Sequence, residues 1–144
     1  MGLAFAPATL GTSGMTDSAY HALYLEGIRF FNECDFFEAH EVWEELWQDE
    51  EGESKKYYQG LIQAAVALHH FGNENIRGAR KLNVSCRKYL DPYRPSYLGL
   101  DLDKFLAQLD QCFAEAMAST EEFPQVKVVP DLIPEIHLDP AVNA

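Results

Sequence analysis

The sequence predicts an all-α domain of about five helices packed around one central apolar helix, followed by an extended, proline-rich C-terminal tail. Apolar residues recur at helical spacing in five separate segments. Residues 57–71 (YYQGLIQAAVALHHF) contain no acidic residue, lysine or arginine, so a helix there must be covered on most sides. Four prolines after residue 123 argue against both a long helix and a central strand in that region.

The 144 residues divide into three parts. Residues 1–15 are small and turn-prone, and we expect a flexible N-terminal arm. Residues 16–120 form the helical domain, and residues 121–144 form the tail, which is too apolar to float free. The tail is therefore expected to pack on the helices or on a second subunit. No internal repeat is evident.

Capping residues suggest where the first two helices begin. The first is expected to start after Thr16 or Asp17, both common N-cap residues, and to end near residue 33. The second is expected over 35–49, because Asp35 and Glu38 have the spacing of a capping box.

The remaining helix boundaries follow from similar signals. The central helix is expected to end near Gly72, in the position after the cap where glycine is favoured. Asn73 or Asn75 can cap the fourth helix, and the proline after residue 91 stops it. Asp101 is expected to cap the fifth.

The charge balance limits the partners. The chain carries 23 acidic and 11 basic residues, a net charge of −12, which argues against nucleic acid or an anionic membrane surface. Basic residues do gather at positions 77–88, where a solvated basic face is expected and an anion or RNA site is the alternative. No apolar run reaches membrane-spanning length and no secretory signal pattern is present. Three separated cysteines without a CxxC motif indicate reduced thiols, so we expect a cytoplasmic protein.

Polar residues inside the apolar faces form the candidate site. In the second helix, His40 and Glu44 stand four residues apart within the apolar arc, and each needs a partner there. The second and central helices should pack antiparallel, which would bring their polar residues together. The predicted polar cluster consists of His40, Glu41, Glu44, Gln59, Gln63 and His70.

Three functions remain open for this cluster. The first is a binding or interaction module. The second is a metal-dependent or acid–base hydrolase centred on His40, Glu44 and His70, the residues that would hold a divalent metal. The third is a purely structural homo-oligomer whose buried hydrogen bonds only fix the core. The apolar tail predicts a homodimer in any of these cases, and no small-molecule ligand can be named.

Two long motifs in order resemble the family called domain of unknown function 309. One has the pattern F-x-x-H-E-x-x-E-x-x-W, and the other Q-G-x-I-Q followed by a histidine and N-x-x-G-A. The resemblance covers about residues 20–90 and implies an all-α fold of about five helices without implying an activity. The matching residues are Phe37, His40, Glu41, Glu44 and Trp47, then Gln59, Gly60, Ile62, Gln63, His70, Asn75, Gly78 and Ala79.

Overall fold

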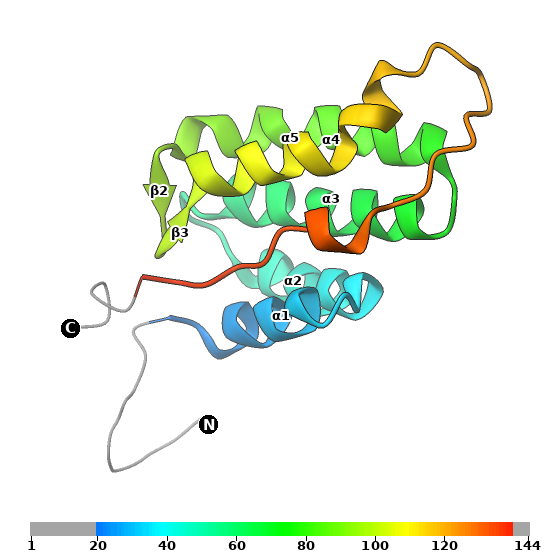
Figure 1. Ribbon diagram of the computed structural model, residues 1–144. Coiled ribbons are helices and arrows are strands. Elements are labelled where there is room, and N and C mark those ends of the chain that lie inside the picture. Colours follow the sequence, from blue (N-terminus) through cyan, green and yellow to red (C-terminus); the bar gives the residue numbers. More distant parts are fainter. Residues whose placement is uncertain (1–19, 140–144) are drawn as a thin grey trace.

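The computed structural model describes residues 20–139, and these are mainly helical, which confirms the all-α prediction. Figure 1 shows the arrangement, with a two-stranded hairpin before the last helix. The helices are α1 (Ala22–Asn32), α2 (Phe36–Asp49), α3 (Lys55–Gly72), α4 (Ile76–Leu90) and α5 (Leu102–Ala118). The strands are β2 (Ser96–Tyr97) and β3 (Leu100–Asp101), and the 3-10 turns are η1 (Asp91–Tyr93) and η2 (Pro130–Leu132).

Helix α3 is the centre of the fold. It packs between α2 and α4, and α5 approaches it through the Phe71 and Phe113 rings, whose centroids lie 4.9 Å apart. The small residues of α3 allow α4 to come close, because a Cβ on Gly60 would lie only 2.6 Å from the Leu90 side chain. None of the helices in the described part of the chain is long and apolar enough to cross a bilayer.

The α1–α2 and α3–α4 connections have the same geometry. Cys34 and Glu74 hold the left-handed backbone position after each helix, with φ of 62° and 63°. Helix α3 ends at Gly72, as predicted, but Glu74 and not Gly72 holds the left-handed position after the cap, so that part of the prediction is wrong. Each turn closes as a Schellman motif. In the first turn, the amides of Cys34 and Asp35 donate to the carbonyls of Phe31 and Phe30, respectively. In the second turn, the amides of Glu74 and Asn75 donate to the carbonyls of Phe71 and His70.

The two helical hairpins also share their burial pattern, a repeat that is not evident in the sequence. Each buried position in α1 and α2 is matched by a buried position 40 residues later in α3 or α4. Residue identities differ in six of the eight pairs, which hides the relation in the sequence. The pairs are Tyr24 and Ala64, Gly27 and Ala67, Ile28 and Leu68, Phe31 and Phe71, Phe36 and Ile76, Ala39 and Ala79, Trp43 and Asn83, and Leu46 and Cys86.

The predicted caps are partly wrong. Helix α1 begins at Ala22, where His21 accepts a hydrogen bond from the Leu23 amide, and the expected caps at residues 16 and 17 lie outside the described residues. Asp35 precedes α2 but its side chain makes no capping hydrogen bond, and the box with Glu38 does not form. The caps of α4 and α5 are confirmed, since Asn75 accepts from the Gly78 amide and Asp101 from the Lys104 amide.

The described part of the tail, residues 121–139, packs on its own subunit and runs back along α5 towards the β2–β3 hairpin (Figure 1). The side chain of Asn32 in α1 makes two hydrogen bonds to the tail backbone. It donates to the Ile136 carbonyl at 2.9 Å and accepts from the Ile136 amide at 2.8 Å. The Asp139 amide donates to the Gly99 carbonyl at 2.8 Å. Val126 and Ile136 are thereby buried in the main core. The expected N-terminal arm lies outside the described residues.

The close contact between α1 and α2 predicts the effect of Gly27→Ala. A Cβ at this position would lie 2.0 Å from Nε1 of the fully buried Trp43, which donates to the Tyr24 carbonyl. The variant should lower the free energy of unfolding by about 1–3 kcal/mol, measured by urea denaturation. Gly72→Ala is the control, because nothing lies within 4 Å of its added methyl group. Equal stabilities of the two variants would contradict the close packing of Gly27 against Trp43.

The two hydrogen bonds between Asn32 and the tail backbone predict the effect of Asn32→Ala. Both Ile136 backbone groups lose their partner, so unfolding should become easier by about 1–3 kcal/mol. Amide hydrogen exchange should accelerate most over residues 133–139. Gln111→Ala, at an exposed position of α5, should leave the exchange of the tail unchanged. Unaltered protection of the tail in Asn32→Ala would show that the apolar contacts hold it alone.

Candidate functional site

Helix α3 reaches solvent along one narrow strip. Between residues 57 and 71, every residue outside this strip is buried. The strip residues recur every three or four positions and are all partly exposed, so they form one face of the helix. We call this face the α3 strip; it consists of Gln59, Ile62, Gln63, Val66, His69 and His70.

His40 and Glu44 form a pair on α2, as expected from their spacing. The Nδ1 atom of His40 lies 3.0 Å from the Phe37 carbonyl oxygen. Because a carbonyl only accepts, Nδ1 carries the proton and Nε2 faces the Glu44 carboxylate, 3.7 Å away. The His40 side chain is 18% exposed and that of Glu44 is 46% exposed. The pair therefore lies at the surface and not in a sealed core.

Phe37 connects this pair to the α3 strip. Its ring centroid lies 5.2 Å from that of His40 and 5.5 Å from that of His69, and the residue is 47% exposed. Neither Phe37 nor His69 belonged to the predicted cluster. The available signal was the spacing of Phe37 and His40, three residues apart on one helix.

Gln63 and His70 turn towards α4. Ser85 donates a hydrogen bond of 2.6 Å to Oε1 of Gln63, and the Asn75 side chain lies 3.4 Å from Nδ1 of His70. Consecutive residues differ by about 100° around a helix, which is why His69 faces α2 while His70 faces α4. The expected single hydrogen-bonded network is thus divided between the two sides of α3.

The last two predicted residues have no polar partner. Gln59 is half-buried and Glu41 is exposed, and neither side chain makes a hydrogen bond or ion pair within the described residues. The amide of Gln59 is therefore without a protein partner in this part of the chain, and Glu41 is a solvated residue.

The donor atoms do not form a metal centre. Within residues 20–139, no three His, Cys, Asp or Glu side chains are grouped so that they could hold a metal ion. His40 and Glu44 provide two donors, but His70 is turned to the α4 side of α3. The geometry thus does not favour the metal-dependent alternative.

The cavity of about 910 Å³ beside β2–β3 offers no better site. It is lined by the hairpin, the start of α5 and Asp139, and it includes no residue of the α3 strip. Two of its carboxylates already have structural partners, because Asp101 caps α5 and Asp103 pairs with Arg94 at 2.6 Å.

A protein-family model matches the part of the chain that contains the α3 strip. The family model described as Domain of unknown function (DUF309) matches residues 24–82. The resemblance seen in the sequence is therefore confirmed. The DUF309 match runs from α1 into α4 and contains the α3 strip together with Phe37, His40 and Glu44.

Two curated relatives are themselves uncharacterised. The protein YpuF of Bacillus subtilis (strain 168) is 33% identical over 91 residues, which are 61% of this chain and 52% of the relative. A protein of Aquifex aeolicus (strain VF5) is 37% identical over 84 residues, which are 56% of this chain and 25% of the relative. The match thus spans about half of one relative and a quarter of the other.

The position of His70 predicts an imidazole that stays neutral. Burial, followed by the neighbouring His69, lowers the pKa of His70 from its ordinary 6.5. A histidine NMR titration should place this pKa below 6.5, and His69→Gln should raise it. A pKa at or above 6.5, or no response to His69→Gln, would contradict the geometry.

The same shift predicts a contribution to acid sensitivity. Because the folded-state pKa of His70 is below the unfolded value, its stabilising contribution is present above pH 6.5. This contribution is lost as the pH falls through the folded-state pKa. His70→Gln should therefore lose less stability than the natural protein between pH 7 and pH 5 in urea denaturation. An equal loss in both proteins would rule out this role for His70.

Proposed function

We propose that this chain is a binding module and that its recognition surface is the α3 strip together with Phe37, His40 and Glu44. The observation that carries the proposal is the selective exposure of α3. Between residues 57 and 71, helix α3 is buried on its other faces and presents one strip to solvent. Of the six side chains in this strip, two are aliphatic, two are amides and two are imidazoles.

The chemistry of this surface suits a protein segment as the ligand. Phe37 is 47% exposed, and covering an aromatic ring is worth about 1.5–3 kcal/mol when burial is complete. Elsewhere on the proposed surface, Gln59 has an amide without a polar partner in the described residues, and Glu44 has a partly exposed carboxylate. A surface that combines apolar and hydrogen-bonding groups is the usual composition of a protein interface.

The relatives support a module in a second way. The matching region makes up 52% of one relative and 25% of the other, so similar domains occur in chains with different amounts of additional sequence. A unit that is placed in different chains while keeping its fold is what the term module implies.

The other expectations remain predictions with less support. A hydrolase centred on His40, Glu44 and His70 is not favoured, because the third residue lies apart from the other two. The homodimer was predicted from the apolar side chains of the tail, and two of these, Val126 and Ile136, are already buried within their own chain. The cytoplasmic location and the lack of nucleic-acid binding also stay predictions.

The proposed surface can be tested by site-specific photo-cross-linking. A benzophenone amino acid at Phe37 of the full chain, expressed in the organism that encodes it, should give a discrete adduct of higher mass. The same group at Gln111, exposed on α5, is the control and should not give that adduct.

A second substitution tests the chemistry of the surface. Adding His69→Ala to the Phe37 probe should weaken the adduct band at least threefold, because the imidazole beside the ring is lost. Circular dichroism checks that the variant is folded. Identical adducts at the Phe37 and Gln111 positions, or no adduct at either, would refute the proposed recognition surface.

A further inference from the structure

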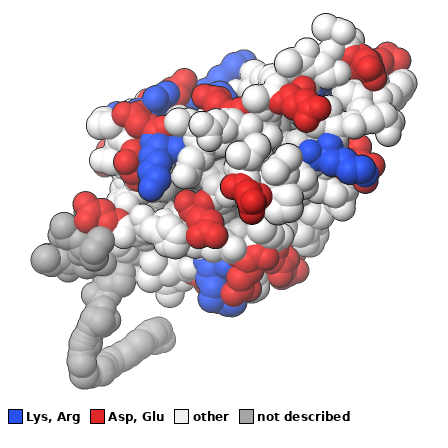
Figure 2. All heavy atoms as spheres, viewed as in Figure 1, with Lys and Arg blue, Asp and Glu red and all other residues white. Residues whose placement is uncertain are grey.

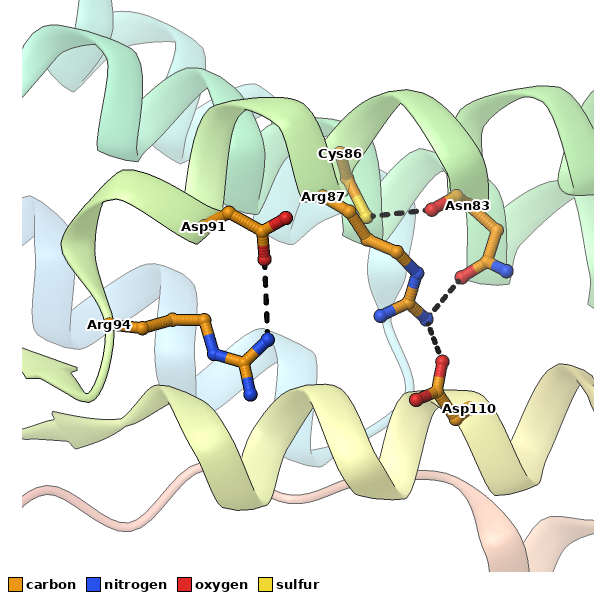
Figure 3. Close-up of polar contacts among 6 residues, drawn as sticks. All are labelled: Asn83, Cys86, Arg87, Asp91, Arg94 and Asp110. Carbon is orange, nitrogen blue, oxygen red and sulfur yellow. Dashed lines mark hydrogen bonds and ion pairs between the residues drawn. The ribbon is translucent and has the colours of Figure 1, made fainter.

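The basic residues of α4 do not form one solvated face. Arg77 stacks over the Phe123 ring at 5.5 Å, and Arg80 donates to the Ser119 carbonyl at 3.5 Å. Arg87 pairs with Asp110 at 2.7 Å and with Asn83 at 3.1 Å, as Figure 3 shows. Lys81 and Lys88 remain, and neither makes an ion pair or hydrogen bond to any residue in the range 20–139.

Lys88 lines a cavity of about 410 Å³ between the end of α4 and the start of α3. A second lysine, Lys56, lines the same cavity and likewise has no ionic partner among the described residues. The lining of this cavity includes two lysines and no carboxylate, although the chain as a whole has a net charge of −12. On the face of the molecule in Figure 2, by comparison, the two signs are interspersed. The full lining is Lys56, Ser85, Lys88, Tyr89, Pro92 and Tyr93.

The walls of the cavity carry three hydroxyl groups. Ser85 donates to Gln63 of the α3 strip and keeps its oxygen lone pairs, and Tyr93 donates to the Glu53 carbonyl. The Tyr89 hydroxyl has no hydrogen-bond partner in the described part of the chain. Tyr93 is held in place by ring contacts with Tyr97 at 4.6 Å and Tyr57 at 5.4 Å. A flat, positioned aromatic wall therefore lies beside unpaired cationic and hydroxyl groups.

We propose that this cavity binds a small organic anion, a phosphate or carboxylate attached to a flat body that lies against the tyrosine wall. An anion in the cavity can accept charge-assisted hydrogen bonds from the two lysines, and their positive charge attracts it. The volume exceeds what a lone ion needs and falls in the range of about 300–1,000 Å³ found for small-ligand sites.

The inference does not rest on the proposed recognition surface. Lys56 and His69 are separated by about 20 Å along α3 at 1.5 Å per residue, so a ligand in the cavity leaves Phe37 free. Failure of the cross-linking experiment would therefore leave the anion site standing, and the reverse also holds.

The test is an NMR titration of the ¹⁵N-labelled full chain with phenyl phosphate, benzoate and phenol. Phenyl phosphate or benzoate should shift the amides of Lys56, Ser85, Lys88 and Tyr93, whereas phenol should cause much smaller shifts. The two anions distinguish a phosphate ligand from a carboxylate ligand. Equal shifts by phenol, or no shifts in this region with either anion, would overturn the proposal.

Matched lysine variants separate a built site from diffuse charge attraction. Lys56→Gln and Lys88→Gln should each weaken binding of the more effective anion by about threefold, and the double variant by about tenfold. Lys81→Gln is the control, because Lys81 is an exposed, unpaired lysine of the same helix that does not line the cavity. A loss with Lys81→Gln as large as with Lys88→Gln would reduce the binding to general electrostatics and refute the site.

Discussion

A helix with hardly any charged side chains has to be covered, and this requirement governs the structure. Helix α3 is 18 residues long, and nine of them are buried. Helices α2 and α4 flank it, and the missing side chain of Gly60 lets α4 approach closely enough for Leu90 to fill the space. What these neighbours leave open is the α3 strip, so the candidate surface is a direct result of how α3 is packed.

The ends of α3 are held by different interactions. At its start, the hydroxyls of Tyr57 and Tyr24 lie 2.7 Å apart, and Tyr24 donates to the Leu98 carbonyl of the β2–β3 hairpin at 3.1 Å. The proton between the two hydroxyls therefore comes from Tyr57. Burial, followed by the tyrosine contact, moves the pKa of Tyr57 well above its ordinary value, so this network is neutral at physiological pH. At the other end, the left-handed Glu74 turns the chain directly into α4, as Cys34 does between α1 and α2.

The polar residues of the central helix acquire distinct roles from this arrangement. His69 belongs with Phe37 and His40 on the α2 side, whereas Gln63 and His70 contact Ser85 and Asn75 on the α4 side. The proposed anion cavity is lined by Ser85, which donates to Gln63, and the proposed recognition surface includes Phe37. One helix thus organises two surfaces of different chemistry, apolar and imidazole-rich in one case and cationic in the other.

The sequence by itself determined the helices, the central position of residues 57–71, the extended tail and the resemblance to DUF309 over part of the chain. These depend on local periodicity, on proline and on motif order, all of which act within a few residues of each other. The i, i+4 pairing of His40 with Glu44 followed from helix geometry alone, although the pair lies at the surface and not on an inward face.

Only the tertiary structure decided which polar groups meet. Whether His69 or His70 faces α2 depends on the rotation of α3 about its axis, and a difference of one residue turns a side chain by about 100°. That rotation is set by side-chain packing, such as Leu90 against Gly60, which involves residues far apart in the chain. The same holds for the tail, because the hydrogen bond between Asn32 and Ile136 joins positions 104 residues apart. No local pattern encodes such contacts, which arise only when the whole core is assembled.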